Sequence, residues 1–266
     1  MLPRTAPPPA PPAAGWRWAV LGGLCGIVAT VALFAPARWL AQGLKDATDG
    51  RLVLVNPRGT VWNGSAGVVF ASGQGGAESI SLPGLLDWKL RPAWGGVTAA
   101  LELPCCAPQP LQFRALPHRE GLQLDWRDGR SRWPAALLAG FGAPWNTLRP
   151  EGVLDIATQS FSMRWNGPQL ALAGRATLAA TDISSSLSTL KPMGSYRLTL
   201  EGGAQPTVLL ATRDGSLQLS GSGRWNGRAL RFDGEGSAAP GREDALSNLL
   251  NIIGRREGAR SLITLG

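Results

Sequence analysis

The residue types that most often carry catalysis or bind metal are scarce in this sequence. It has one histidine, His118, and three cysteines, of which Cys25 lies in an apolar segment and Cys105 and Cys106 are adjacent. Adjacent cysteines can bond to each other only through a strained ring, so two free thiols and a redox-sensitive loop both fit the pair. Three cysteines do not build a disulfide framework, although a periplasmic location would favour oxidation.

No stretch of the chain matches a catalytic or cofactor-binding motif. A nucleophile elbow, a P-loop, a dinucleotide fingerprint and a zinc-protease helix are all missing. His118 has no carboxylate or cysteine at metal-ligand spacing, and we expect it in a surface loop. The 18 acidic residues lie mostly at expected turns or strand ends, so a carboxylate pair could arise only through folding. The sequence therefore predicts a protein that is not an enzyme, with no catalytic, cofactor-binding or metal-binding residues and no cofactor.

The formal net charge of +8 raises the question of nucleic-acid binding. Only three of the 26 basic residues are lysine, and the arginines are scattered along the chain rather than concentrated in one stripe. A basic domain beside anionic lipid is the milder interpretation. We therefore expect no nucleic-acid partner.

The segment that should position everything else lies near the start. Residues 19–35 contain no charge, and with flanking residues they predict a transmembrane helix over 16–36. Tryptophans flank it on both sides, and the preceding tail carries Arg4 and Arg17 but no acidic residue. The positive-inside rule then leaves the amino terminus in the cytoplasm and the bulk of the chain in the periplasm.

A cleaved signal peptide is the alternative for the same segment. Ala35-Pro36-Ala37 loosely resembles a cleavage site with small residues. The proline between the alanines disfavours cleavage, and the apolar core is longer than the usual ~7–15 residues. We therefore prefer an uncleaved, single-pass anchor in the inner membrane.

The composition divides the chain into four parts. Residues 1–15 are rich in proline and alanine and should form a disordered cytoplasmic tail. The transmembrane helix at 16–36 is followed by a short membrane-proximal helix at 37–48 and then by a periplasmic β-rich domain at 49–266. The 35 glycines and 21 prolines suit many short strands joined by turns.

Two helices interrupt the expected strands. We predict one over 131–141 and a second over 243–253, where four apolar residues follow a helical spacing. The second helix is interpreted as a lid on the sheet, with a partner or membrane contact as the alternative. A loop at 73–76, a turn at 56–59 and a hairpin turn at Asn63-Gly64 separate early strands.

A short motif recurs along the chain. Arg164-Trp-Asn-Gly167 returns as Arg224-Trp-Asn-Gly227, and the segment 60–64 is a weaker third copy. Each of the two full copies lies between apolar runs with strand-like alternation. The pattern indicates a repeated hairpin that extends one sheet. A chance combination of a strand-forming tryptophan with a turn-forming Asn-Gly pair is the simpler explanation.

The carboxyl-terminal part resembles a known family. Residues 221–239, 246–258 and 260–263 are similar to the type II secretion system protein N family, most specifically in Leu-Leu-Asn-Ile-Ile-Gly-Arg-Arg at 249–256. Residues 59–64 and 82–85 and the single amino-terminal anchor fit the same family. The resemblance implies an inner-membrane accessory component of the machine that exports folded periplasmic proteins across the outer membrane. It carries no catalytic residues with it.

The expected fold is therefore mainly β: a transmembrane helix and then a curved, mostly antiparallel periplasmic sheet with a few short helices. The sheet resembles in style those of AsmA/TamB-like envelope proteins. Expected partners are other inner-membrane subunits of the secretion system and the lipid of the inner membrane. The alternative function is lipid binding or bridging on a concave apolar face. The candidate residues for that face are Leu122, Leu124, Trp126, Leu170, Leu172 and Leu178.

Overall fold

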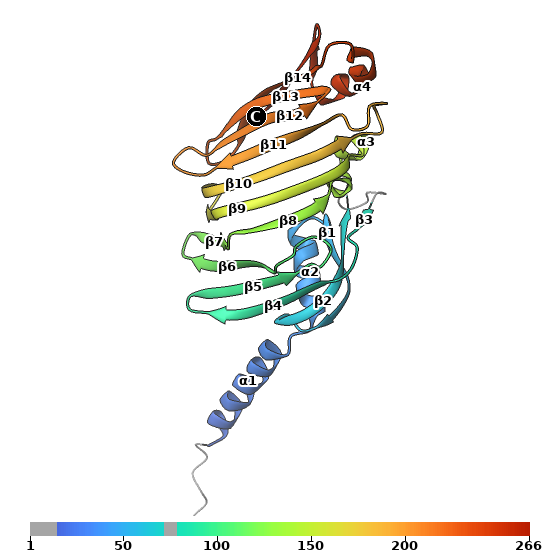
Figure 1. Ribbon diagram of the computed structural model, residues 1–266. Helices are drawn as coiled ribbons and strands as arrows, with labels where there is room; N and C mark the ends of the chain where they lie inside the picture. Colours follow the sequence, from blue (N-terminus) through green and yellow to red (C-terminus); the bar gives the residue numbers. More distant parts are fainter. Residues whose placement is uncertain (1–14, 72–78) are drawn as a thin grey trace, which may run out of the picture.

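The computed structural model describes residues 15–71 and 79–266, and within them one twisted sheet dominates (Figure 1). The predicted tail at 1–15 falls almost wholly outside the described residues, as does the predicted loop at 73–76. The helical elements are α1 (Gly15–Leu33), α2 (Ala37–Ala47), the 3-10 helix η1 (Ala135–Phe141), α3 (Trp145–Leu148) and α4 (Glu243–Ile253).

The sheet is antiparallel throughout, and most neighbours in space are neighbours in sequence. Its order is β1-β2-β4-β5-β6-β7-β9-β10-β11-β12-β13-β14-β16-β15, with β3 paired to β2 and β8 paired to β9. The strands are β1 (Leu52–Gly59), β2 (Asn63–Ala71), β3 (Ser79–Ser81), β4 (Leu86–Ala93), β5 (Gly96–Glu102), β6 (Leu111–His118), β7 (Gly121–Trp126), β8 (Gly129–Pro134), β9 (Glu151–Asn166), β10 (Gln169–Ser184), β11 (Gly194–Glu201), β12 (Thr207–Gly215), β13 (Leu217–Trp225), β14 (Leu230–Ala238), β15 (Arg255–Glu257) and β16 (Arg260–Leu265).

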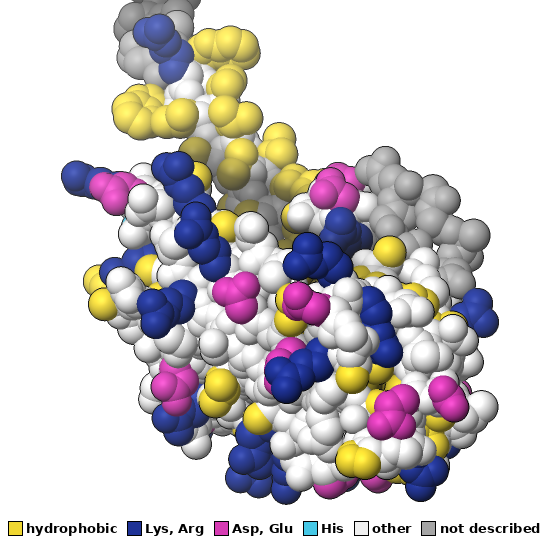
Figure 2. All heavy atoms as spheres, turned by 90° about the horizontal axis from the view of Figure 1, so that it is seen from above, with side chains coloured by type: hydrophobic (Ala, Val, Ile, Leu, Met, Phe, Trp, Pro, Cys, Tyr) yellow, Lys and Arg dark blue, Asp and Glu magenta, His cyan; other side chains and the backbone are white. Residues whose placement is uncertain are grey.

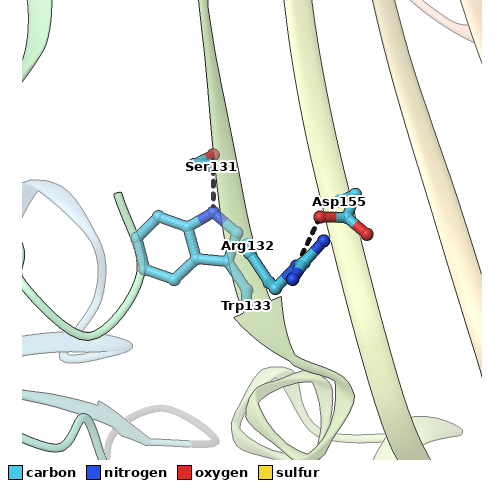
Figure 3. Close-up of polar contacts among 4 residues, drawn as sticks. All are labelled: Ser131, Arg132, Trp133 and Asp155. Atoms are coloured by element: carbon cyan, nitrogen blue, oxygen red, sulfur yellow. Dashed lines mark hydrogen bonds and ion pairs between the residues drawn. The ribbon is translucent and has the colours of Figure 1, made fainter. Parts of the chain in front are cut away.

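Alternation along the strands gives the sheet one polar and one apolar face. Figure 3 shows both at β8 and β9: Arg132 reaches Asp155 on one side, and the Trp133 indole lies on the other. The register carries this division across the sheet, because directly opposed residues share a face. We call the side of Arg132 the polar face and the side of Trp133 the apolar face.

At the β1 end, α2 and η1 cover the apolar face. Trp88 of β4 is the largest side chain there and is 1% exposed. Its Nε1–H donates to the Val61 carbonyl at 3.0 Å, so the buried indole has its polar atom satisfied. Gly64 opposes Trp88 in the register, and a Cβ at that glycine would collide with the indole ring. Close packing therefore explains the glycine.

At the β14 end, α4 covers the apolar face. Leu246, Leu249 and Leu250 are buried against a cluster that includes Leu217 and Tyr196. The predicted bounds of the helix are confirmed, and so is its packing on the sheet. The Ser261 hydroxyl of β16 donates to the Leu250 carbonyl beneath the helix. A helix with three buried leucines stabilises this end by apolar burial rather than by propensity.

Several local predictions were wrong. Residues 131–134 form β8 rather than a helix, which begins only at Ala135 and is of the 3-10 type. Pro134 disfavours helical conformation at the residue before it, and the alternation of buried Ser131, exposed Arg132 and half-buried Trp133 fits pairing with β9. The strand β1 continues through the predicted turn at 56–59, with a bulge between Val55 and Arg58.

The hairpin turn predicted at Asn63-Gly64 lies earlier in the chain. The Thr60 N–H donates to the Asn63 carbonyl at 2.8 Å, so the turn is made by residues 61–62 and Asn63 begins β2. Asn63 does not have the positive φ that a two-residue Asn-Gly turn needs. The third copy of the repeat is thus a different structure from the other two.

The two full copies of the repeat are hairpin ends, and they touch. Gly167 and Gly227 each have a positive φ and lie in the turns of β9–β10 and β13–β14. The Leu170 N–H donates to the Gly227 carbonyl at 2.8 Å, and the Trp225 Nε1–H donates to the Leu170 carbonyl at 2.7 Å. The repeat therefore joins two hairpins around the shorter β11–β12 hairpin.

Candidate functional site

The helix α1 stands apart from the sheet with its apolar side chains exposed (Figures 1 and 2). The window Trp16–Leu33 has a mean hydropathy of 1.6, and none of it is buried. Its length and composition suffice to cross a membrane, and a signal sequence near the amino terminus would meet the same criterion. The helix ends at Leu33, three residues before the predicted boundary, because Pro36 lies in a β-bridge with Thr60.

The carboxyl end of α1 is tied to the first hairpin of the sheet. The Trp62 Nε1–H donates to the Ala32 carbonyl at 2.6 Å, and the Val61 N–H donates to the Ala35 carbonyl at 2.8 Å. We call these contacts the helix–sheet joint. The first contact satisfies a carbonyl in the last turn of α1 that the helix itself leaves unpaired, and the second holds the short link that follows the helix. The direction of α1 is thereby coupled to the sheet rather than left to a free linker.

The helix α2 follows the joint at once and packs along β1. Ala37 is buried in the apolar cluster around Trp88, and Leu40 and Leu44 pack against that cluster. Trp39 and Arg38 face the other way and are exposed. An exposed tryptophan beside an arginine next to an apolar helix is typical of the membrane–water interface.

The cysteine pair and the histidine are separate from this joint and from each other. Cys105 and Cys106 are bonded in a disulfide; Cys106 is buried in the apolar cluster around Trp88, and Cys105 is exposed. The sequence left open two free thiols or a redox-sensitive loop, and the structure shows the loop in its oxidised form. His118 ends β6 instead of lying in a loop, is exposed, and has its Nε2 2.9 Å from Asn166 Oδ1. In residues 15–71 and 79–266, no group of three or more histidine, cysteine or acidic side chains could hold a metal ion.

The six residues suggested for an apolar surface do share the apolar face. The register opposes Leu122 to Trp165, Leu124 to Met163, and Leu172 to Met163 on the other side. Leu172 is buried, while Leu122 is 37% exposed. Trp126 stacks between two aromatic rings at centroid distances of 5.6 and 6.2 Å. The other four candidate residues are half-buried, and helices cover the apolar face at either end of the sheet.

The polar face carries ion pairs between neighbouring strands. They join Lys89 to Glu102 at 2.8 Å, Arg132 to Asp155 at 2.8 Å, Arg175 to Glu201 at 2.7 Å, and Arg260 to Glu235 at 3.3 Å. The hydrogen bond to Asp155 and then its charge raise the pKa of Arg132, which stays protonated in any case (Figure 3). Water screens such exposed pairs, so they set alignment more than stability.

Over β10–β14 the polar face is hollowed, with a volume of about 1000 Å³. Arg175, Arg197, Arg224 and Arg231 line it, and we call it the arginine hollow. In sequence these arginines look scattered, because 56 residues separate the first from the last. Only the strand register brings them together. The available signal was the alternation of polar and apolar residues within each strand, but it identifies the hollow only once the strand pairing is known.

The two edges of the sheet differ in access. The β1 edge meets the helix–sheet joint through the Pro36–Thr60 bridge, and α2 packs beside it. At the other edge, all three residues of β15 are exposed. An exposed edge strand offers unpaired backbone groups to an incoming strand. The β15 edge is therefore the accessible one.

Comparison with known proteins places the whole domain in one family. No curated protein sequence and no solved structure shows a significant match to the chain. A family model described as "Type II secretion system (T2SS), protein N" matches residues 50–263, which is nearly all of the sheet together with η1, α3 and α4. The chain therefore belongs to the type II secretion system protein N family.

Proposed function

We propose that this protein is an accessory inner-membrane component of the type II secretion system, which supports export of folded proteins from the periplasm through contacts with other subunits. Membership of the family makes the chain a type II secretion component. The observation that carries the finer proposal is the helix–sheet joint: an exposed apolar helix is fixed directly to a domain of the family's fold. A domain held in this way stays at the membrane surface, where the other inner-membrane subunits are assembled.

In this proposal the tail is cytoplasmic, α1 spans the membrane once, and the sheet lies in the periplasm. Arg17 and the absence of acidic residues before α1 support that orientation. A periplasm-only reporter fused after Gly266, together with the mass of the amino terminus, tests it. A membrane-retained, full-length chain with an active reporter is expected. A soluble product beginning near Ala37 would overturn the anchor.

Protein contacts are the proposed means of action, and the β15 edge is the surface that suits them. A photo-crosslinking residue at Arg256 should capture another secretion subunit in cells that secrete. The same residue at Arg119, in an exposed turn far from that edge, is the matched control. If neither position captures a subunit while the machine stays assembled, the contact proposal fails. Normal secretion after deletion of the chain would contradict the supporting role itself.

Lipid binding on the apolar face stays a prediction. Lipid binding there requires the six candidate residues to share one face, as they do. However, α2 and η1 cover one end of that face and α4 covers the other. Native mass spectrometry of the detergent-extracted protein tests it. A reproducibly bound phospholipid is the expected result for a lipid carrier, and its absence would remove this function.

A further inference from the structure

The arginine hollow has an excess of positive charge that the fold itself does not neutralise. Its lining contains four arginines but only two carboxylates, Glu201 and Asp233. Glu201 already pairs with Arg175 at 2.7 Å. Among the described residues, the side chains of Arg197, Arg224 and Arg231 have no ion pair and no hydrogen bond.

Two of these arginines are placed where they repel each other. Arg224 of β13 and Arg231 of β14 are directly opposite in the register. Like charges in that position destabilise an antiparallel pair. A bound anion would remove the repulsion, and the planar guanidinium groups suit bidentate bonds to a carboxylate or phosphate.

The rest of the lining narrows the class of anion. Leu209 of β12 lies inside the hollow and is 56% exposed, an unusual position for a leucine on the polar face. Glu201 and Asp233 would repel a densely charged polyanion. A ligand that presents separated carboxylates and an apolar side chain satisfies the arginines and covers Leu209 together. An acidic peptide segment with interspersed apolar residues has this chemistry.

The place of the hollow in the fold disfavours the headgroups of the anchoring membrane. The joint lies at β2, and six strand spacings of about 4.8 Å, or roughly 29 Å along the sheet, separate β2 from β10. Figure 1 shows β10–β14 at the end of the sheet opposite α1. The Debye length is about 8 Å at physiological salt, so a membrane at α1 attracts these arginines little.

We infer that the arginine hollow is a docking site for an acidic, partly apolar peptide segment of a protein partner. This inference rests on the proposed function, since it takes the partner to be a protein of the same secretion machine. The segment's carboxylates bind Arg197, Arg224 and Arg231, while Arg175 is held in place by Glu201. An apolar residue of the segment covers Leu209.

Fluorescence anisotropy on the full chain in detergent micelles tests this with a short labelled peptide of alternating glutamate and leucine. We expect saturable binding that weakens with added salt. The double variant Arg224→Gln with Arg231→Gln should weaken binding about tenfold or more, because each charge-assisted hydrogen bond that is lost changes the affinity by about tenfold. Arg91→Gln with Arg119→Gln changes the net charge equally, outside the hollow, and should leave binding within about twofold.

Other outcomes overturn the inference. Equal loss in both double variants would mean that general surface charge attracts the peptide. Equal binding of a glutamine-leucine peptide would remove the role of carboxylates. If vesicles of phosphatidylglycerol bind through the hollow and the peptide does not, the ligand is a lipid headgroup. Thermal unfolding of each variant, monitored by circular dichroism, shows that the comparison is made on folded protein.

Leu209→Ser provides a second measure that leaves every charge in place. It should weaken the glutamate–leucine peptide severalfold and leave an all-glutamate peptide unaffected. An equal effect on both peptides, or none on either, would contradict the apolar contact. These measurements do not depend on secretion. Normal secretion after deletion of the protein would therefore contradict the proposed function without changing the peptide-binding results. Absence of peptide binding would contradict only the docking site in the arginine hollow.

Discussion

The first strands of the sheet, β1 to β5, and its last strands, β10 to β14, each bury an apolar face beneath a helix. In the first region, α2 and η1 lie over Trp88; in the second, α4 lies over Leu217. Their polar faces differ. At β4–β5, Glu102 lies opposite Asp87 in the register, and Lys89, its diagonal neighbour on β4, neutralises it at 2.8 Å. At β10–β14 three arginines have no carboxylate partner among the described residues, and two of them oppose each other.

This difference separates two roles within one sheet. The first region is joined to α1 and has a buried indole at its centre, so its residues are used for attachment and stability. The second region keeps an equally buried apolar side but leaves its polar side electrostatically unsatisfied. Unsatisfied charge is a cost to the folded state, and folds retain such costs where a ligand is bound. Each prediction below tests one side of this contrast.

The largest effect is expected at the centre of the first region. Trp88→Ala should lower the free energy of unfolding by about 3–5 kcal/mol, because it opens a cavity under α2 and leaves the Val61 carbonyl without its donor. Denaturant unfolding of the full chain in micelles, followed by circular dichroism, measures it. Trp94→Ala is the matched control, since Trp94 is 96% exposed and should change stability by no more than about 0.5 kcal/mol. Similar losses at both positions would contradict the assigned core.

A slightly smaller loss is expected in the second region. Leu250→Ala should cost about 2–5 kcal/mol, since Leu250 is buried between α4 and the sheet. Ile252→Ala, on the exposed side of the same helix, is the control. Amide hydrogen exchange would show whether protection falls only in β11–β16 or also in β1–β5. Loss of protection in both regions would mean that the sheet unfolds as one unit. The two regions would then differ only in their polar surfaces and not in their stability.

Periodic segments were predictable from sequence, and segments decided by neighbours were not. The stripe of leucines at 243–253 predicted α4 to the residue, because one buried face determines a helical spacing. Residues 131–134, included in a predicted helix, formed β8, because the partner strand β9 supplied backbone hydrogen bonds that the sequence does not display. At Gly64 the glycine indicated a turn, but the close approach of the Arg58 carbonyl and the Trp88 indole is what requires it.

The candidate functional surfaces also differ in whether they could be predicted from sequence. The apolar helix and its flanking tryptophans were recognisable from composition, since the span is local in sequence. The arginine hollow was not, because its residues come from five strands and meet only through the register. The repeated Trp-Asn-Gly motif predicted two hairpins. It could not predict that Leu170 and Gly227 bond to each other, since that contact depends on the short β11–β12 hairpin between them.

The joint that distinguishes the first region should respond to a smaller change. Trp62→Phe keeps an aromatic ring at this site and removes the indole N–H that reaches the Ala32 carbonyl. We expect a loss of about 0.5–1.5 kcal/mol, concentrated at the joint, because one hydrogen bond is removed with little change in packing. Hydrogen exchange at the Val61 amide should accelerate relative to wild type. Trp94→Phe is the control, and unchanged protection at Val61 would show that the helix is not held by this contact.

The smallest effect at neutral pH, and the clearest mark of the second region, comes from Tyr196, the single tyrosine of the chain. Burial, and secondarily the charge of Asp214, raise the pKa of its hydroxyl, which donates to the Leu217 carbonyl at 3.2 Å. The unfolded chain loses this proton near the ordinary tyrosine pKa of about 10, while the folded chain keeps it. The unfolded state therefore binds fewer protons above that pH, and the contribution of Tyr196 to stability, complete below about pH 10, falls as the pH rises. Ultraviolet absorbance of the phenolate should appear only as the β14 end unfolds, and Tyr196→Phe should lack this alkaline component of the loss. Phenolate absorbance near pH 10 in the folded protein would mean that Tyr196 is open to water, and that the apolar face of the second region is less completely buried than that of the first.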